Sequence, residues 1–443
     1  MKETKRTYVP FTEEMKKDYT ILVPNMLPMH LKLIIQVLKN EGYRRIELLE
    51  TGGPRIAETG LKYTHNDTCY PAILVIGQFI DAIQSGKYDA NKVALIMFQT
   101  GGGCRASNYI YLIRKALQKA GYGHVPVISL NLKGMEDHPG FRMTVPIIYR
   151  MFHAILCADL LMSLVNQCRP YEITPGESEA LAERYTKEIA DGMKRDGISF
   201  GKVKKWYRQI LADFAQIPRR VEKRVKVGVV GEIYVKFSPL GNNNLNDFLV
   251  SEGAEVVVPG LLDFFLYTLY NSIVNCEHYG TGRKKQPILK LAFKFLSKKQ
   301  QELIEIVKQD GHFTPATPFV HTIELVRGYI DCGVQMGEGW LLPAEMLELS
   351  DSGVKNIVCT QPFGCLPNHI CGKGMMKPLR DRNPDMNIVA VDYDAGASRV
   401  NQENRIKLML ANARERLEQE SAEPVEESAE SNKTANYFLY ELK

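Results

Sequence analysis

Three cysteines lie in loops rich in glycine, proline and asparagine, where their side chains could do metal or redox chemistry. Cys69 lies in HNDTCYPA, Cys104 in QTGGGC and Cys365 in QPFGC. The neighbouring pattern of apolar runs predicts a helix N-terminus after each cysteine. Unpaired N–H groups and the helix dipole at such a position favour a thiolate and lower the thiol pKa. Soft thiolates brought together select zinc, copper(I) or an iron–sulfur cluster, so these three are the candidate metal ligands.

The other six cysteines are weaker candidates. Cys359 and Cys371 flank Cys365 with five residues in each gap, which is not the spacing of a zinc ribbon or a ferredoxin. Cys359, at a strand end, is kept as a weaker metal ligand. The remaining four lie in patterns where a free cysteine packs as a small hydrophobe: Cys157, Cys168, Cys276 and Cys332. Buried or incidental thiols are the alternative for the whole set.

Other residues of these loops could assist the cysteines. Backbone without a side chain approaches a ligand closely, and successive N–H groups bind anionic sulfur or phosphate. The candidate cofactor-binding glycines are Gly102, Gly103 and Gly364. No catalytic residue can be assigned, and the candidates are His65, Glu232 and His369. A loop histidine is also an ordinary surface group. In GEGWLLPAEM, the start of a helix explains at least one of Glu338 and Glu345.

The elements that must position these residues alternate between strands and helices. Short apolar runs such as 20–24, 93–98 and 225–235 are separated by amphipathic stretches of helical length. This alternation predicts an α/β fold with parallel sheets covered by helices. Binding sites in such folds form beyond the carboxyl ends of the strands. We therefore expect two Rossmann-like parallel-sheet lobes with a mostly helical inserted region.

The predicted organisation has six parts, and the second lobe is interrupted by an insertion. The parts are an N-terminal extension (1–18), a first Rossmann-like lobe with Cys69 and Cys104 (19–145), a helical region (146–222), a second Rossmann-like lobe with Cys365 (223–262 and 346–418), a helical insertion (263–345) and an acidic tail (419–443). Low apolar content predicts that the tail is disordered.

Composition and motif content argue against several classes of function. The chain has 443 residues, of which 45% are apolar and 24% are charged, and a net charge of +5. The small charge without a basic stripe argues against nucleic-acid binding. The absence of an apolar run of membrane-spanning length and of a signal peptide predicts a cytoplasmic protein that does not enter a membrane. No Walker A or strand-linked G-x-G-x-x-G pattern occurs, so nucleotide hydrolysis by this chain is not expected.

From about residue 60 to 415, the chain resembles the 2-hydroxyacyl-CoA dehydratase and benzoyl-CoA reductase superfamily, in the branch associated with acyl-CoA dehydratase activases. The resemblance rests on HNDTCYPA, QTGGGCRASNY, RPYE, VGEIYVKF, GEGWLLPAEM, QPFGCLPNHI and VDYDAGASRVNQENRIKLML. It implies that Cys69, Cys104 and Cys365 bind an iron–sulfur cluster, 4Fe–4S or double-cubane, where Rossmann-like lobes meet. The GEI and GEGWLL stretches depart from the characterised dehydratases, and no CoA-binding signature is found.

The resemblance also implies partners and a reaction. A separate ATP-dependent activase, itself an iron–sulfur ATPase, would deliver a low-potential electron to the cluster for radical or reductive chemistry on an acyl-CoA. The chain would pair with a second copy or with a paralogous subunit. Two alternatives stay open: a non-catalytic, cluster-carrying electron relay or partner subunit, and a structural protein with a zinc site.

Overall fold

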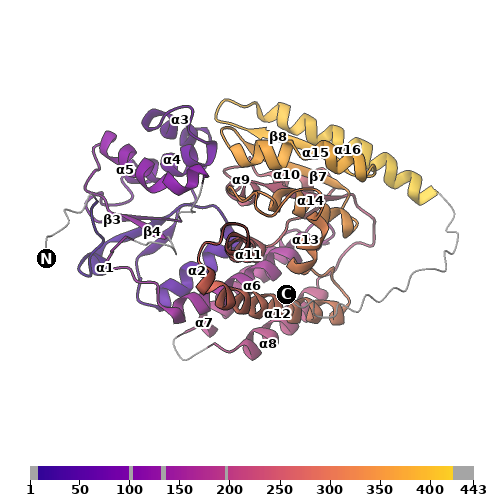
Figure 1. Ribbon diagram of the computed structural model, residues 1–443, viewed down its shortest axis with the longest axis horizontal. Helices are drawn as coiled ribbons and strands as arrows, with labels where there is room; N and C mark the ends of the chain where they lie inside the picture. The colour runs from indigo at the N-terminus through magenta and orange to yellow at the C-terminus, as the bar shows by residue number, and fades with distance from the viewer. Residues whose placement is uncertain (1–7, 99–102, 131–135, 195–197, 423–443) are drawn as a thin grey trace.

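The computed structural model describes residues 8–98, 103–130, 136–194 and 198–422. Within these ranges the chain forms two four-stranded sheets, both entirely parallel, with strand orders β2-β1-β3-β4 and β6-β5-β7-β8. In each sheet the second strand along the chain lies on one side of the first strand, and the third and fourth strands lie on the other side. The predicted α/β fold with two parallel-sheet lobes is confirmed. In Figure 1 the two lobes lie side by side, with a layer of long helices below them.

The first sheet and its helices come from the N-terminal part of the chain. Its strands are β1 (Thr20–Val23), β2 (Ile46–Leu48), β3 (Val93–Phe98) and β4 (Val127–Leu130). Its helices are α1 (Met15–Asp18), α2 (Pro28–Asn40), α3 (Pro54–Tyr63), α4 (Tyr70–Gln84), the 3-10 turn η1 (Arg105–Asn108) and α5 (Tyr109–Lys119).

The second sheet is assembled from two separate stretches of the chain. Its strands are β5 (Lys226–Gly231), β6 (Glu255–Val257), β7 (Asn356–Pro362) and β8 (Asn387–Tyr393). The associated helices are α9 (Ile233–Phe237), α10 (Leu245–Ser251), α14 (Leu341–Asp351), the π-helical segment η3 (Asn368–Lys373), α15 (Met376–Arg382) and α16 (Arg399–Ala422).

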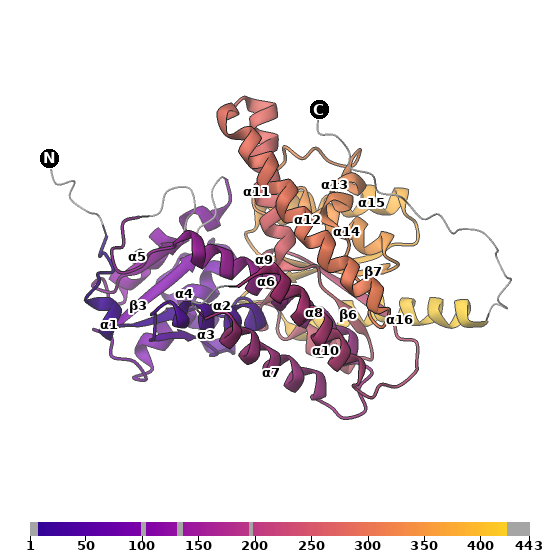
Figure 2. The ribbon, with the colours of Figure 1, turned by 90° about the horizontal axis from the view of Figure 1, so that it is seen from below.

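Long helices precede the second sheet and also interrupt it. The first group is α6 (Val145–Cys168), α7 (Glu177–Gly192) and α8 (Phe200–Ala215). The second group, between β6 and β7, is α11 (Leu261–Tyr279), the turn η2 (Arg283–Lys285), α12 (Gln286–Asp310) and α13 (Phe319–Val326). Figure 2 shows the tip of the α11–α12 hairpin projecting from the body of the protein. The chain therefore has helical segments where the sequence predicts them, while the exact domain boundaries stay predictions.

The central strands are mostly apolar because helices cover both faces of each sheet. Nearly every residue of β3, β5 and β7 is buried, which explains their continuous apolar runs in place of alternation. Parallel strands joined by helices also bring all carboxyl ends of one sheet to the same edge. The loops that follow β3, β5 and β7 contain Cys104, Glu232 and Cys365.

Two glycines fix the position of the helix that follows Cys69. A β-carbon at Gly60 of α3 would lie 2.1 Å from the carbonyl oxygen of Ile73, and one at Gly77 of α4 would lie 2.0 Å from that of Ile56. The two helices therefore touch through their backbones, which no larger residue permits. This contact holds the N-terminus of α4, and with it Cys69, against the first lobe.

One helix within the described ranges, α6, is long and apolar enough to cross a membrane by length and composition. Inside the protein, however, 67% of its most apolar window is buried. It also contains Arg150, His153 and Asp159, all with partners in the fold. This burial is typical of a core helix.

A buried ion pair joins the short helix α9 to α14. Lys236 Nζ donates to Glu345 Oε1 at 2.8 Å, and the two residues are only 5% and 2% exposed. Burial raises the pKa of Glu345, while the charge of Lys236 opposes that rise. A buried pair of this kind needs both partners, since either charge alone is strongly destabilising.

Lys236→Ala should therefore lower the free energy of unfolding by about 3–5 kcal/mol, because it leaves the Glu345 carboxyl without its partner. Urea denaturation measures this loss. Lys187→Ala, which removes an exposed i,i+4 pair with Glu183, is the control and should cost under about 1 kcal/mol. Equal losses for the two variants would contradict the structural role of the buried pair.

Candidate functional site

The loops of Cys69 and Cys365 are in direct contact, although they come from different lobes. The N–H of Tyr70 donates to the carbonyl of Phe363 at 3.1 Å. A β-carbon at Gly364 would lie 3.2 Å from Cys69 Cα. Gly364 has φ +73°, a left-handed conformation that favours glycine. The chain therefore places a glycine where the two cysteine loops meet most closely.

Cys104 reaches the same region through a fourth loop, residues 334–340, which precedes α14. A β-carbon at Gly337 would lie 3.7 Å from Cys104 Sγ and 3.1 Å from Cγ of Pro367, two residues after Cys365. At Gly103, a β-carbon would lie 2.9 Å from Met336 Sδ. The three cysteine loops are thus gathered together, two from the first lobe and one from the second.

Two polar side chains contact the sulfurs directly. Tyr109 OH lies 3.0 Å from Cys69 Sγ, inside the protein. Asn368 Nδ2 donates to Cys365 Sγ at 3.5 Å, also in a buried position. Both residues lie within the stretches quoted above, Tyr109 in QTGGGCRASNY and Asn368 in QPFGCLPNHI, but neither stretch marks its residue as a partner of a cysteine. Tyr109 reads there as an ordinary apolar position of α5, and only the packing of α5 on α4 brings it to Cys69.

Two carboxyl groups meet at the start of α9, close to the cysteines. Glu232 caps this helix by accepting the N–H of Val235 at 2.9 Å, and Glu338 accepts the N–H of Ile233 at 2.9 Å. Burial raises the pKa of each carboxyl, and the charge of Glu338 raises that of Glu232 further. The sequence predicts that a helix start accounts for at least one of Glu338 and Glu345, and it accounts for Glu338, although the helix concerned is α9 and not the following α14.

The thiols themselves are buried and hard to ionise. Cys69 and Cys365 are buried and Cys104 is half-buried. Burial raises the pKa of all three, to about 12 for Cys104, and the charges of Glu338 and Glu232 raise the pKa of Cys104 and Cys365 further. The predicted lowering of these pKa values is therefore wrong for the protein alone, because loss of water outweighs the helix dipole.

The predicted helix N-termini are only partly correct. Cys69 directly precedes the 15-residue helix α4. Cys104 instead precedes the 3-10 turn η1, with α5 beginning at Tyr109. Beyond Cys365, the chain turns within three residues into the π-helical segment η3. Such segments are rare and occur frequently at functional sites.

The remaining predicted site residues lie in varied settings. His65 is exposed and pairs with Asp67 through Nδ1 at 3.2 Å. His369 is exposed, but its Nδ1 contacts the amide of the buried Gln361. Cys359 is fully buried within β7, where a β-carbon at Gly372 would lie 3.3 Å from its sulfur. Its setting is that of a packed core thiol. Gly102 lies outside the described residues.

The spacing of the metal-ligating side chains limits which metal groups they could bind. Across the described ranges, no three His, Cys, Asp or Glu side chains are close enough to share one metal ion. A cluster of several iron atoms is larger, and it contacts each thiolate through a separate iron. The three thiols come from three separate loops, with Gly364 where two of these loops approach most closely. Positive iron would also reverse the raised thiol pKa values, as bound metals do.

Gly364→Ala tests the contact between the cysteine loops. The new methyl group meets Cys69 and adopts an unfavourable φ, so the free energy of unfolding should fall by about 2 kcal/mol. Gly353→Ala is the matched control, since Gly353 also has a positive φ but no atom within 4 Å of its would-be β-carbon. The free energy of unfolding of Gly353→Ala should fall by about 1 kcal/mol, because only the positive φ is unfavourable there. Equal losses in urea denaturation would show that the loops are not tightly joined.

In chemical terms, the site combines three thiols from two lobes with two carboxyl groups of raised pKa. A phenol and an amide contact two of the sulfurs. Such a site can bind soft metals and hold protons beside them. Comparison with protein-family models and with curated protein sequences finds no match for this chain.

Proposed function

We propose that Cys69, Cys104 and Cys365 bind an iron–sulfur cluster and that the chain is an electron-accepting component of the 2-hydroxyacyl-CoA dehydratase type. The observation that carries the proposal is the meeting of three cysteine loops from two lobes, with Gly364 packed against Cys69. A ligand shared by the three thiols requires such a convergence. The resemblance in seven sequence stretches gives the class of that ligand.

The surroundings of the thiols suit this role. A bound cluster would supply one-electron chemistry at low potential, and its potential depends on hydrogen bonds to sulfur, nearby charge and burial. Tyr109 and Asn368 supply hydrogen bonds to two sulfurs, and Glu232 and Glu338 supply negative charge and protons nearby. Three protein thiolates leave one corner of a 4Fe–4S cubane free for a ligand from outside the chain.

An exposed apolar surface surrounds the cysteine loops. Phe363, Leu366 and Ile370 are 48%, 55% and 55% exposed, and Met336, next to Gly103, is 52% exposed. Apolar side chains gathered at one place on a surface mark contact with another molecule. We propose that this surface contacts the ATP-dependent activase or a second subunit, either another copy or a paralogue, in the cytoplasm. The substrate proposed is an acyl-CoA.

Anaerobically purified protein should contain iron and acid-labile sulfide. Cys104→Ser and Cys365→Ser should lose most of both, because each removes a thiolate from the cluster. Cys157→Ser is the control and should keep its iron, since Cys157 is buried in the core of α6. Iron and sulfide analysis, with Mössbauer and EPR spectra, makes the measurement. Protein with zinc in place of iron, or equal iron in all three variants, would overturn the proposal.

Turnover separates an enzyme from an electron relay. With the activase, ATP and an acyl-CoA, an enzyme gives product, whereas a relay is reduced without consuming the acyl-CoA.

Tyr109→Phe should lower the midpoint potential of the bound cluster, because the phenol no longer donates to Cys69 and the reduced, more negative state loses stabilisation. One hydrogen bond of about 1 kcal/mol corresponds to about 40 mV for a one-electron couple. A redox titration followed by EPR measures the change. Tyr111→Phe, at an exposed position of the same helix, should leave the potential unchanged. Equal potentials in both variants would exclude a role for Tyr109.

A further inference from the structure

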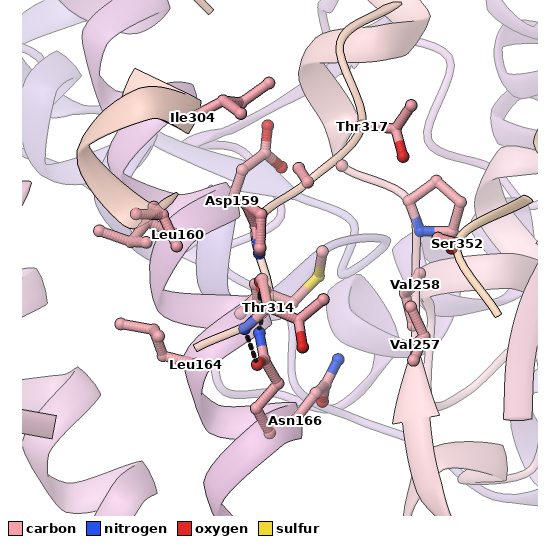
Figure 3. A pocket seen from close by; sticks show the side chains of 18 of the residues that line it. Asp159, Leu160, Leu164, Asn166, Val257, Val258, Ile304, Thr314, Thr317 and Ser352 are labelled. Carbon is pink, nitrogen blue, oxygen red and sulfur yellow. Dashed lines mark hydrogen bonds between the residues drawn. The ribbon is translucent and has the colours of Figure 1, made fainter. Parts of the chain in front are cut away.

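A cavity of about 160 Å³ lies apart from the cysteine loops, between α6, the edge strand β6 and the helices α11, α12 and α14. Figure 3 shows Leu160 and Leu164 of α6 on one side and Val257 and Val258 on the other. The half-buried Gln167 and the exposed Thr314 exchange two hydrogen bonds at its rim. A cavity of this size accommodates a ligand about as large as a benzene ring.

Four carboxyl groups line this cavity, and two of them are fully engaged by the fold. Asp159 accepts the N–H groups of Leu261 and Leu262 at 2.7 and 3.0 Å and also contacts His30. Glu255 pairs with Lys226 at 3.2 Å and accepts from a tyrosine hydroxyl. These two carboxyls therefore stabilise the helix start and the sheet edge, and they have no need of a ligand.

The other two carboxyl groups, Asp263 and Glu348, are not balanced by any cation at the cavity. Asp263 is 8% exposed and accepts one hydrogen bond, from Gln300 at 2.7 Å. Glu348 is 9% exposed, lines the cavity, and its Oε2 has no hydrogen-bond partner. Lys226, the basic side chain in the cavity lining, pairs with Glu255, and Lys236, whose charge acts on Glu348, pairs with Glu345. A buried carboxyl oxygen without a donor costs free energy unless a ligand provides one.

The charge of Glu348 also acts on Asp263. Burial raises the pKa of Asp263 well above its usual range, and the charge of Glu348 raises it further. Burial likewise raises the pKa of Glu348, to about 7. Buried carboxyls that line one cavity either hold protons or accept a cation.

We infer that this cavity is a binding site for a small organic amine, whose protonated nitrogen contacts Asp263 and Glu348 and whose carbon body packs on Leu160, Leu164 and Ile304. An ammonium group donates the hydrogen bond that Glu348 Oε2 lacks, as a charge-assisted bond. The apolar walls require carbon in the ligand.

Other ligand classes fit the same walls less well. An anion would face four carboxyl groups, with Lys226 as the single basic side chain among the lining residues that the structure describes. A bare metal ion needs several ligands at once, and no three acidic, cysteine or histidine side chains in the described ranges are close enough together. A neutral apolar molecule would fill the cavity but would leave Glu348 Oε2 without a donor.

The test compares cyclohexylamine with cyclohexanol, which share a carbon frame and differ in the charged nitrogen. Isothermal titration calorimetry of the full chain at neutral pH should show saturable binding of the amine, and binding of the alcohol at least about tenfold weaker. Equal affinities would show an apolar cavity without amine recognition and would overturn the inference. Absence of binding by both would overturn it as well.

Glu348→Gln and Asp263→Asn identify the groups responsible. Each should weaken cyclohexylamine binding about tenfold or more while leaving cyclohexanol binding unchanged. Glu305→Gln, which removes an exposed carboxyl of α12 outside the cavity, is the control and should bind like the original chain. Unchanged amine affinity in both cavity variants would overturn the inference. Should either variant fail to fold, the comparison of amine with alcohol on the original chain still decides it.

Discussion

The buried ion pair between Lys236 and Glu345 is the interaction on which the candidate site depends. It ties the five-residue helix α9 to α14, and a helix as short as α9 has little stability of its own. Glu232 precedes α9 and Glu338 precedes α14. The pair therefore sets where both carboxyls lie relative to the cysteines. It also leaves Lys236 unable to neutralise Glu348, which is why the cavity beside α14 keeps an unbalanced carboxyl.

Sheet topology explains why loops so distant in sequence meet. In both sheets the order in which strands are added reverses at the first strand, since the second strand lies on one side of it and the third on the other, so the reversal falls between β1 and β3 in one sheet and between β5 and β7 in the other. Ligand sites of parallel α/β folds form at such reversals. Glu232 follows β5 and Cys365 follows β7, so both lie at the reversal of the second sheet. Cys69 does not follow a strand directly, and it needs the glycine contact between α3 and α4 to come within reach.

Much of this organisation could be predicted from sequence because it depends on local pattern. Apolar runs and amphipathic stretches identify buried strands and covering helices, and the loop cysteines stand out by their glycine and proline neighbours. The environment of those cysteines could not be predicted, since it is set by packing between segments far apart in the chain. Tyr109 ends the QTGGGCRASNY stretch, but that stretch does not show that its hydroxyl meets Cys69. The raised pKa values of the thiols likewise reflect their burial in the fold, which no local motif encodes.

The division of the three cysteines between two lobes has a consequence for biogenesis. Cys69 and Cys104 leave the ribosome long before Cys365, which follows them by at least 261 residues (365 − 104 = 261). A nascent chain thus carries two of the thiols without the third until the last strands of the second sheet are made. Any group held by all three must be inserted after translation has passed β7 and both lobes have docked. A chain that holds such a group has therefore been completed and correctly folded, whereas a truncated or half-folded chain cannot bind it.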